Sequence, residues 1–442
     1  MSSQTKRVAV VGAGIAGLAA AFRMKQAGLD PVVFEAGDYA GGRIKSFRRG
    51  EFLYDVGAFI YLGSYTQAVD LMRDAGLSDQ IGRFDAYGAM PRDGQLHFLD
   101  LNKPIRTILG SGYLSAGAKL RAIKLFALLA KHWKDLNYHD GSAIAAIDTD
   151  SVNSWCDKHL DAELRDYLAG VVVRGPWLAD PSETSIAMLL WTLKNFFKPW
   201  FYNLRDGMDA LPRALAKSLD VRFQHEVLNV ANLGHEVEVT YRTDGQEKSE
   251  RFDRALLTTT TDRLLAIYPQ VQGVQRQFFE TNEYISSVNT HLALRRRPAN
   301  PATYIMNSMK QDPDWCGVIV DHLKAEGRVP TGKGMITVFC RHQWCVKHLD
   351  APAEVILKQV IGFLRPYYGD LTEEIEDYEI GRWPLVVPIM RAGRFKAVAE
   401  YQKTFNPRDR VQFAGDLVPM GGVNAALVSG EQAAQRLTAQ YD

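Results

Sequence analysis

Short apolar runs and amphipathic stretches alternate in a regular order at the start of the chain. Lys6 to Val11 ends in a β-branched run that predicts a buried strand. Gly12 to Gly17 follows as a glycine-rich turn, and Leu18 to Ala27 has a helical pattern closed by Gly28. Residues 31–35 predict a second strand. Strand, glycine turn, helix and strand within about thirty residues predict a βαβ unit.

The glycine spacing within this unit indicates a site for a nucleotide diphosphate. Gly12 permits a tight turn, Gly14 lets the backbone approach a pyrophosphate, and Gly17 lets helix and strand pack closely. The helix that follows offers unpaired N–H groups and a positive dipole end. Glu35 ends the second strand, where its carboxylate can accept a hydrogen bond from a ribose 2′-hydroxyl. We therefore expect an adenosine without a 2′-phosphate.

A second glycine turn, Gly41-Gly42-Arg43, adds an arginine able to pair with a phosphate. Together with Val10 to Leu18 and Phe34-Glu35-Ala36, it resembles the FAD signature of the flavin amine oxidase superfamily. That superfamily includes monoamine oxidases, protoporphyrinogen oxidases and carotenoid-type desaturases. The resemblance implies FAD as the cofactor and an α/β fold. Its core would be a discontinuous Rossmann-type FAD-binding domain of the glutathione-reductase-like kind.

Further segments match the superfamily and extend the implied cofactor site. By resemblance, Gly57 and Ala58 run beside the flavin, Val227 meets the adenine through backbone groups, and the strand 255–260 ends at the cofactor. Near the C-terminus, Asp416 is implied to bond a ribityl hydroxyl, and the N–H of Val423 a flavin carbonyl. The predicted cofactor-binding residues are Gly12, Ala13, Gly14, Ile15, Ala16, Gly17, Glu35, Ala36, Gly41, Gly42, Arg43, Gly57, Ala58, Val227, Thr259, Gly415, Asp416, Gly422 and Val423.

The 442 residues suggest two or three lobes rather than one core. We assign residues 1–76, 207–280 and 405–442 to the FAD-binding domain. Residues 77–206 and 281–404 form an inserted α+β substrate-binding domain with a mixed sheet and helices.

Composition narrows the possible partners. The net charge of +1 gives no general attraction to nucleic acid. Cys340, His342, Cys345 and His348 have an atypical spacing for zinc, and we interpret them as core thiols and surface histidines, with no metal. The first residues contain no apolar signal region, and no run reaches the roughly eighteen apolar residues of a membrane span. We expect a cytoplasmic protein; its oligomeric state is left open.

Two stretches of the predicted substrate domain allow more than one interpretation. Residues 116–133 predict a basic amphipathic helix, which we interpret as packed on its own domain in preference to a membrane surface. Its predicted apolar face carries Leu120, Ile123, Ala127 and Ala130. Residues 186–202 are the most aromatic passage, and they suit either a core or the wall of an apolar pocket.

The predicted reaction follows from departures from the amine oxidase pattern. Amine oxidases carry a lysine near flavin N5, and Thr290 aligns at that position here, with His291 next to it. The two flanking aromatic positions fall at residues 387–388 and at Gly422, and neither is aromatic. Simple amine oxidation is therefore disfavoured. The segments 287–292 and 383–388 resemble more closely the protoporphyrinogen oxidase and carotenoid/squalene desaturase branch.

We predict an enzyme that removes a hydride from carbon of a largely apolar small molecule, by C–C or ring C–N dehydrogenation. The hydride would pass to flavin N5, and O2 or another acceptor would reoxidise the cofactor. An amine or amino-acid oxidase with an atypical pocket and a flavin-dependent double-bond isomerase are the alternatives. His291 is the candidate proton acceptor, although strand alternation puts Thr290 and His291 on opposite faces and favours a structural histidine. Tyr61 and Trp383 are candidates for the pocket, or for the core.

Overall fold

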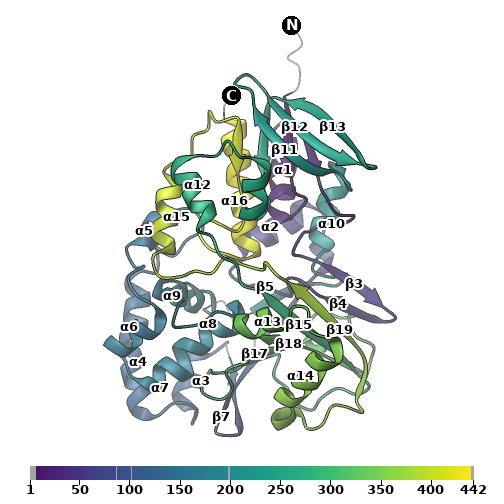
Figure 1. The fold of residues 1–442 in the computed structure, drawn as a ribbon. Helices are drawn as coiled ribbons and strands as arrows, with labels where there is room; N and C mark the ends of the chain where they lie inside the picture. The colour runs from purple at the N-terminus through teal and green to yellow at the C-terminus, as the bar shows by residue number, and fades with distance from the viewer. Residues whose placement is uncertain (1–5, 86, 101, 198–199, 440–442) are drawn as a thin grey trace.

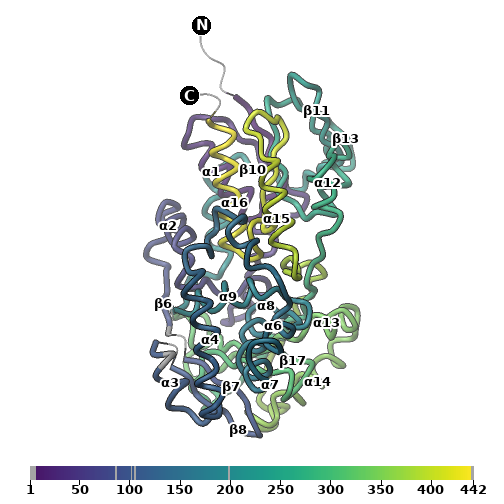
Figure 2. The backbone as a smooth tube through the Cα atoms, turned by 90° about the vertical axis from the view of Figure 1, so that its left-hand side faces the viewer, coloured from purple at the N-terminus to yellow at the C-terminus, as the bar shows by residue number. Residues whose placement is uncertain are grey.

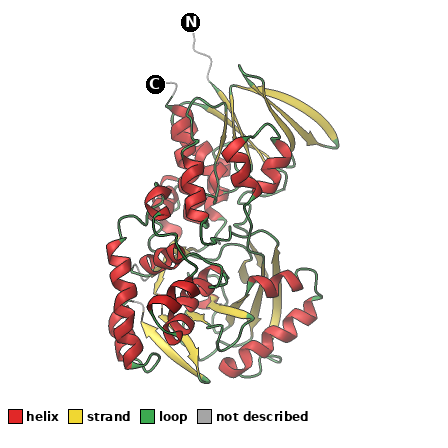
Figure 3. Cartoon of the chain, turned by 60° about the vertical axis from the view of Figure 1, so that its left-hand side comes forward, coloured by secondary structure: helices red, strands yellow, loops and turns green. Residues whose placement is uncertain are grey.

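The computed structural model describes residues 6–85, 87–100, 102–197 and 200–439. Two lobes, each with strands flanked by helices, lie one above the other (Figures 1 and 3). Both ends of the chain lead into the upper lobe.

A five-stranded parallel sheet forms the centre of the upper lobe. Its order is β10-β2-β1-β14-β20. The strands are β1 (Arg7–Val11), β2 (Asp30–Phe34), β10 (Asp220–Arg222), β14 (Arg254–Leu257) and β20 (Val411–Phe413). Apolar side chains on both faces are buried, as expected for a parallel sheet covered on both sides. Because the strands come from three distant stretches, the chain leaves this sheet and returns to it twice.

Helices cover one face of this sheet and an antiparallel sheet covers the other. The helices are α1 (Ile15–Gln26), α2 (Thr66–Asp74), α10 (Ala210–Lys217) and α16 (Val423–Thr438). α1 and α16 touch closely, because a Cβ on Gly430 would lie 2.2 Å from the Ala16 carbonyl oxygen. The second sheet comprises β11 (Glu226–Asn232), β12 (Val237–Thr243) and β13 (Gln246–Phe252), and α11 (Thr261–Ile267) and α12 (Gly273–Glu280) lie beside it.

The lower lobe contains a seven-stranded mixed sheet, in the order β19-β15-β18-β17-β16-β7-β8. Its strands are β7 (Tyr87–Arg92), β8 (Gln95–Asp100), β15 (Ser287–Leu294), β16 (Tyr304–Met306), β17 (Trp315–Val320), β18 (Gly334–Cys340) and β19 (Ile375–Trp383). α13 (His342–His348) and α14 (Ala353–Tyr368) pack on one face, while α8 (Gly170–Trp177) and α9 (Ile186–Asn195) lie on the other.

The remaining α-helices and strands connect and flank these sheets. They are β3 (Ser46–Arg49), β4 (Phe52–Asp55), β5 (Tyr61–Leu62), β6 (Ile81–Asp85), α3 (Pro104–Gly110), α4 (Ala116–Lys131), α5 (Gly141–Ala145), α6 (Val152–His159), α7 (Ala162–Leu164), β9 (Trp200–Leu204) and α15 (Arg394–Gln402). α9, in the aromatic passage, is buried almost throughout.

α4 packs through a different face from the one we had assigned to the interior. Ala118, Ala122, Leu125 and Leu129 are buried, whereas Leu120, Ile123, Ala127 and Ala130 are exposed. The helix does rest on its own domain, but the predicted apolar face points to solvent. Each face has two large apolar residues and two alanines, so the apolar pattern alone did not distinguish the buried face from the exposed one.

The four cysteines are buried thiols. Within the described ranges, no His, Cys, Asp and Glu side chains are grouped as a metal site. In the same ranges, no helix has the length and apolar character needed to span a bilayer.

Candidate cofactor and substrate cavity

A cavity of about 670 Å³ lies between the two lobes. Its upper part is formed by loops at the carboxyl ends of β1, β2, β14 and β20, and its lower part by β15, β18 and α8–α9. This is the place where open parallel sheets bind ligands.

Two helix N-termini meet at the upper part. Gly14 caps α1 and Gly422 caps α16, and neither glycine has a side chain that could accept a hydrogen bond from the first N–H groups of its helix. Ile15, Ala16 and Val423 line the cavity, so the free N–H groups and positive dipole ends of both helices face it. A Cβ added to Gly14 would meet no atom within 4 Å. The space beside Gly14 is therefore an open cradle for an anionic group.

Glu35 is held at the edge of this cradle. Its two carboxylate oxygens accept hydrogen bonds from the N–H groups of Ala13 and Gly37, each at 2.8 Å. Each oxygen keeps capacity to accept another hydrogen bond. The carboxylate is thus oriented to receive the two hydroxyls of a ribose.

Arg43 and Asp416 form a bidentate ion pair in the wall of the cavity. The guanidinium donates to the two carboxylate oxygens at 2.7 and 2.9 Å, and also to the Val386 carbonyl at 2.6 Å. Burial lowers the pKa of Arg43, but the charge and hydrogen bonds of Asp416 outweigh this and raise it. We expected each residue to meet the cofactor separately; in the structure they contact each other and present a joint donor and acceptor surface.

The segment after β4 is clamped against the cavity. The Val56 carbonyl accepts hydrogen bonds from Trp383 Nε1 at 2.6 Å and from Asn289 Nδ2 at 3.2 Å. A Cβ on Gly57 would lie 2.2 Å from the Arg43 carbonyl oxygen, so only glycine fits there. Gly57 and Ala58 consequently run along the cavity wall.

Fifteen of the nineteen predicted cofactor-binding residues line this cavity. They are Gly12, Gly14, Ile15, Ala16, Glu35, Gly41, Gly42, Arg43, Gly57, Ala58, Thr259, Gly415, Asp416, Gly422 and Val423. The other four are Ala13, Gly17, Ala36 and Val227.

These four residues have other surroundings. Ala13 anchors Glu35 through its N–H. Gly17 serves helix packing, because its Cβ would lie 2.1 Å from the Gly12 carbonyl oxygen. Ala36 is exposed, and Val227 is buried in the core with its carbonyl accepting from Arg263. Direct contact of these residues with a cofactor stays a prediction, and for Val227 the resemblance implied contact through backbone groups, which a buried side chain allows.

Of the four catalytic candidates, Trp383 lines the cavity and the other three do not. Tyr61 is fully buried and its hydroxyl donates to the Met208 carbonyl at 3.3 Å; burial raises its pKa. Thr290 is buried, and its hydroxyl has no hydrogen-bond partner within the part of the chain that the structure describes. Tyr61 therefore takes the second of the two alternatives given for it, the core, and Thr290, which we aligned with the lysine near flavin N5, does not line the cavity.

His291 is a buried structural histidine. Its Nδ1 lies 2.8 Å from the Thr337 hydroxyl, which in turn donates to Asp321 Oδ2 at 2.6 Å. Because the hydroxyl proton is committed to Asp321, Nδ1 must carry the imidazole proton. Burial lowers the pKa of His291 to about 4. The neutral ring therefore ties β15 to β18, away from the cavity.

The residues of β15 that line the cavity are Ser287 and Asn289. Successive side chains of a strand alternate between faces, and a shift of one residue exchanges the faces. Our alignment put Thr290 at the lysine position, but Asn289 faces the cavity. Ser287 pairs with Trp383, which lines the cavity. Strand alternation from Ser287 would therefore have placed Asn289 on the cavity face.

The lower part of the cavity is apolar and aromatic. It is lined by Phe59, Ile60, Leu62, Trp177, Leu178, Phe196, Phe201, Tyr304, Phe339 and Val387. Among the described lining residues, the charged side chains are Glu35, Arg43, Asp416 and Arg382. Three of these belong to the upper part, and Arg382 donates to the carbonyls of His348, Leu349 and Ala351.

Trp177 supplies an aromatic wall that the sequence did not reveal. A Cβ on Gly422 would lie 3.4 Å from the Trp177 ring. The ring is oriented by a hydrogen bond from Nε1 to the Thr192 hydroxyl at 2.8 Å. Thus the space left by the missing side chain at residue 422 is filled from α8.

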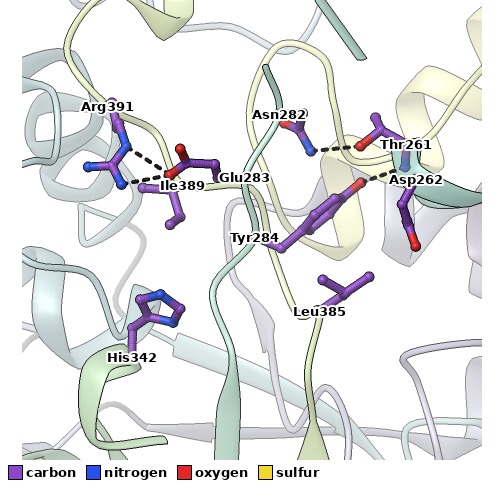
Figure 4. Close-up of a pocket in the computed structure, with 9 residues that line it drawn as sticks. All are labelled: Thr261, Asp262, Asn282, Glu283, Tyr284, His342, Leu385, Ile389 and Arg391. Carbon is purple, nitrogen blue, oxygen red and sulfur yellow. Dashed lines mark hydrogen bonds and ion pairs between the residues drawn. The ribbon is translucent and has the colours of Figure 1, made fainter. Parts of the chain in front are cut away.

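A smaller, more polar cavity of about 430 Å³ lies beside the main one and shares Leu385 with it. Figure 4 shows the Tyr284 hydroxyl near Thr261, and the Glu283–Arg391 ion pair at the opposite side. Burial raises the pKa of Tyr284 to about 12. Leu385 and Tyr284 stand between this cavity and the Arg43 region.

Comparison with known proteins identifies the family of the chain. The family model for flavin containing amine oxidoreductases matches residues 15–438. Mitochondrial protoporphyrinogen oxidase of Nicotiana tabacum is 33% identical over 202 residues, which cover 44% of this chain and 38% of that protein. The matched stretch thus spans about two-fifths of that relative.

Two solved structures share the fold. A double mutant of putrescine oxidase superposes with a TM-score of 0.80 at 19% identity, covering 99% of this chain and 100% of that one. A protein described as a putative protoporphyrinogen oxidase from Exiguobacterium sp. 255-15 superposes with a TM-score of 0.77 at 17% identity, with the same coverage.

Proposed function

The chain belongs to the family of flavin-containing amine oxidoreductases and is a FAD-dependent oxidoreductase, and from this premise we propose its reaction. We propose that it removes a hydride from carbon of a largely apolar small molecule, by C–C or ring C–N dehydrogenation. The observation that carries this proposal is the lower part of the cavity, which is aromatic and has no histidine, lysine or unengaged charge among its described lining residues.

The upper part of the cavity fits FAD on its own geometry. The open space beside Gly14 suits a pyrophosphate, Glu35 suits the ribose hydroxyls, and the Val423 N–H at the start of α16 suits a flavin carbonyl. Bound there, FAD supplies a two-electron acceptor that takes a hydride from carbon at its N5 position.

The protein's own contribution is to position the substrate and exclude water. Phe59 and Phe339, with ring centroids 4.3 Å apart, form one wall of the lower part. Asn289 and Trp383 hold the Val56 carbonyl and thereby fix the backbone that leads to Phe59. Desolvation and orientation of a C–H bond are what such walls provide. Transfer of the hydride leaves a cation on the substrate, and the product two hydrogens lighter forms when that cation releases a proton to solvent, since the described lining of the lower part has no histidine, lysine or unengaged carboxylate to accept it.

The name of the tobacco relative supports an apolar ring substrate, since it is described as a protoporphyrinogen oxidase. A reduced tetrapyrrole or an extended polyene is therefore the first substrate class to test. O2 is the first electron acceptor to test.

One observation favours amine oxidation as the second candidate. Trp177 lies against Gly422 and Trp383 lines the same cavity, so aromatic walls exist although residues 387 and 422 are not aromatic. Such walls can attract an amine nitrogen. An amine would have to bind there without a nearby carboxylate.

Anaerobic reduction of the bound flavin tests the two candidates. The holoenzyme is mixed separately with a porphyrinogen, a hydroxylated carotenoid, a primary amine and an L-amino acid, and bleaching of the flavin absorbance is followed. We expect bleaching by an apolar compound, with a product two hydrogens lighter by mass spectrometry. Replacing Phe339 by alanine should slow this reduction at least about tenfold, because the wall that orients the substrate is lost. Bleaching by amines alone would refute the proposal.

A matched substitution controls for general damage. Phe98 is 38% exposed on β8, outside the cavity lining, so Phe98→Ala should leave the reduction rate unchanged. Equal slowing in both variants would show that the Phe339 effect is unspecific, and would contradict the assigned wall.

A further inference from the structure

The most exposed large apolar side chains in the described part of the chain gather on one surface. Leu120 and Ile123 of α4 are 70% and 60% exposed, and Leu109 of α3 is 57% exposed. Ala127 and Ala130 continue the same exposed face of α4. With Trp133 and Phe197, these residues form what we call the α4 ridge.

The ridge is continuous along the helix. At one end, the Leu109 carbonyl accepts a hydrogen bond from Lys119 Nζ at 2.9 Å, which ties α3 to α4. At the other end, the rings of Trp133 and Phe197 meet edge to face with centroids 5.3 Å apart. Sixteen residues of helix span about 24 Å. α4 stands at the outer edge of the lower lobe (Figures 1 and 2).

The exposed side chains are not required for the packing of α4. Its opposite face buries Ala118, Ala122, Leu125 and Leu129 against the lobe. Contiguous exposed apolar patches of this kind mark interaction sites, whereas apolar side chains scattered singly are common on any protein surface.

Charge indicates what covers the ridge. α4 contains Lys119, Arg121, Lys124 and Lys131 and no acidic residue, and Lys134 follows it. Arg121 is paired with Asp161, whereas Lys124, Lys131 and Lys134 are exposed beside the apolar face. The whole chain carries only +1, so positive charge is concentrated here. Apolar side chains flanked by lysines are the composition of helices that lie in the plane of anionic bilayers.

We propose that the α4 ridge docks on the surface of an anionic lipid bilayer, with Leu120 and Ile123 inserted below the headgroups and the lysines on the lipid phosphates. Phe197 of the ridge follows Phe196, which lines the lower part of the cavity. Docking would therefore bring the apolar end of the cavity close to the bilayer. The importance of this nearness for catalysis rests on the proposed apolar substrate, whereas the docking itself does not.

Vesicle co-sedimentation of the holoenzyme tests the docking. Vesicles of phosphatidylglycerol and phosphatidylcholine in equal parts are compared with vesicles of phosphatidylcholine alone. We expect binding to the mixed vesicles that weakens as salt is raised. The variant Leu120→Ser/Ile123→Ser should bind at least about tenfold more weakly, since two large side chains no longer enter the bilayer. The variant Lys131→Glu/Lys134→Glu should also weaken binding to the mixed vesicles. Its flavin content and melting temperature should not change.

The control is Val346→Ser/Val355→Ser, at two other exposed valines, 51% and 44% exposed, on α13 and α14. It should bind vesicles like the unchanged protein. Flavin content and melting temperature, which all variants should keep, show that each is folded. Equal vesicle binding by the Leu120→Ser/Ile123→Ser variant would overturn the proposal. Failure of the unchanged protein to bind the mixed vesicles would also overturn the proposal. That includes the case in which the ridge instead mediates a dimer that the Leu120→Ser/Ile123→Ser variant dissociates. Neither result depends on which substrate the enzyme oxidises.

Discussion

Replacing Asp55 by asparagine should destabilise the protein strongly, because this carboxylate neutralises buried cations where the lobes meet. Asp55 is 1% exposed and forms ion pairs with Arg328 and with Lys324, whose Nζ lies 3.6 Å away. Its oxygens also accept from the Ser46 hydroxyl at 2.7 Å and the Met208 N–H at 3.1 Å. Burial raises the pKa of Asp55, but Arg328 and Lys324 outweigh this and lower it.

The expected loss of stability in Asp55→Asn follows from the buried charges that remain. Without the Asp55 carboxylate, two buried cations face the single charge of Asp321, which lies 2.6 Å from Lys324. Removing one partner from a buried ion pair costs about 3–5 kcal/mol. Asparagine keeps the shape and some hydrogen bonds, so a value near 3 kcal/mol is expected. Asp55 also precedes the Val56–Gly57 segment, so flavin should be released more easily.

Urea unfolding followed by tryptophan and flavin fluorescence measures both effects. The Asp55→Asn variant should unfold and release flavin at clearly lower urea than the unchanged protein. The control is Asp70→Asn, which breaks an exposed pair with Arg73 at 2.9 Å and should cost about 0–1 kcal/mol. If Asp55→Asn were no more damaging than Asp70→Asn, the buried charges would be compensated in another way and this reasoning would fail.

Three further predictions concern the cavity and β15. Gly14→Val should fold but retain less than about a tenth of the flavin, measured by absorbance after gel filtration, because the new side chain points into the open cradle. Asn289→Val should slow turnover, whereas Thr290→Val should leave turnover unchanged and raise the melting temperature, since it removes a buried hydroxyl without a partner among the described residues. For His291, the unfolded ring takes up a proton below pH 6.5 but the folded ring only near pH 4. Stability should therefore fall by up to about 3 kcal/mol as pH drops from 6.5 to 4, and His291→Gln should flatten that loss in urea titrations. The first prediction fails if Gly14→Val retains its full flavin content. The second fails if Asn289→Val and Thr290→Val lose turnover equally. The third fails if His291→Gln has the same dependence of stability on pH as the unchanged protein.

The cofactor end of the cavity was predictable because its requirements are local. Gly12 and Gly42 have a positive φ that favours glycine, Gly14 leaves the space beside the backbone open, and Glu35 follows its strand at a fixed distance along the chain. Such features need no knowledge of distant contacts. The close approach of Gly430 to Ala16, in contrast, depends on two helices from opposite ends of the chain.

The catalytic end was harder because it depends on register and on packing. A shift of one residue separates Thr290 from Asn289, and both are polar, so the pattern alone did not distinguish them. Trp177 enters the wall from a distant helix, and its nearness to Gly422 has no signal in the sequence. The exposed face of α4 was misassigned because the buried and exposed faces have the same apolar composition, two large side chains and two alanines each.

The contact between α1 and α16 has a consequence for how the protein is made. One side of the cofactor site comes from α1, and the other from α16, which is translated after all the other helices and strands of the two lobes. During translation, the glycine turn, Glu35 and Arg43 are therefore made long before Asp416 and Val423. Tight capture of FAD is thereby postponed until both lobes have been translated, and binding of the cofactor reports that synthesis has run through α16.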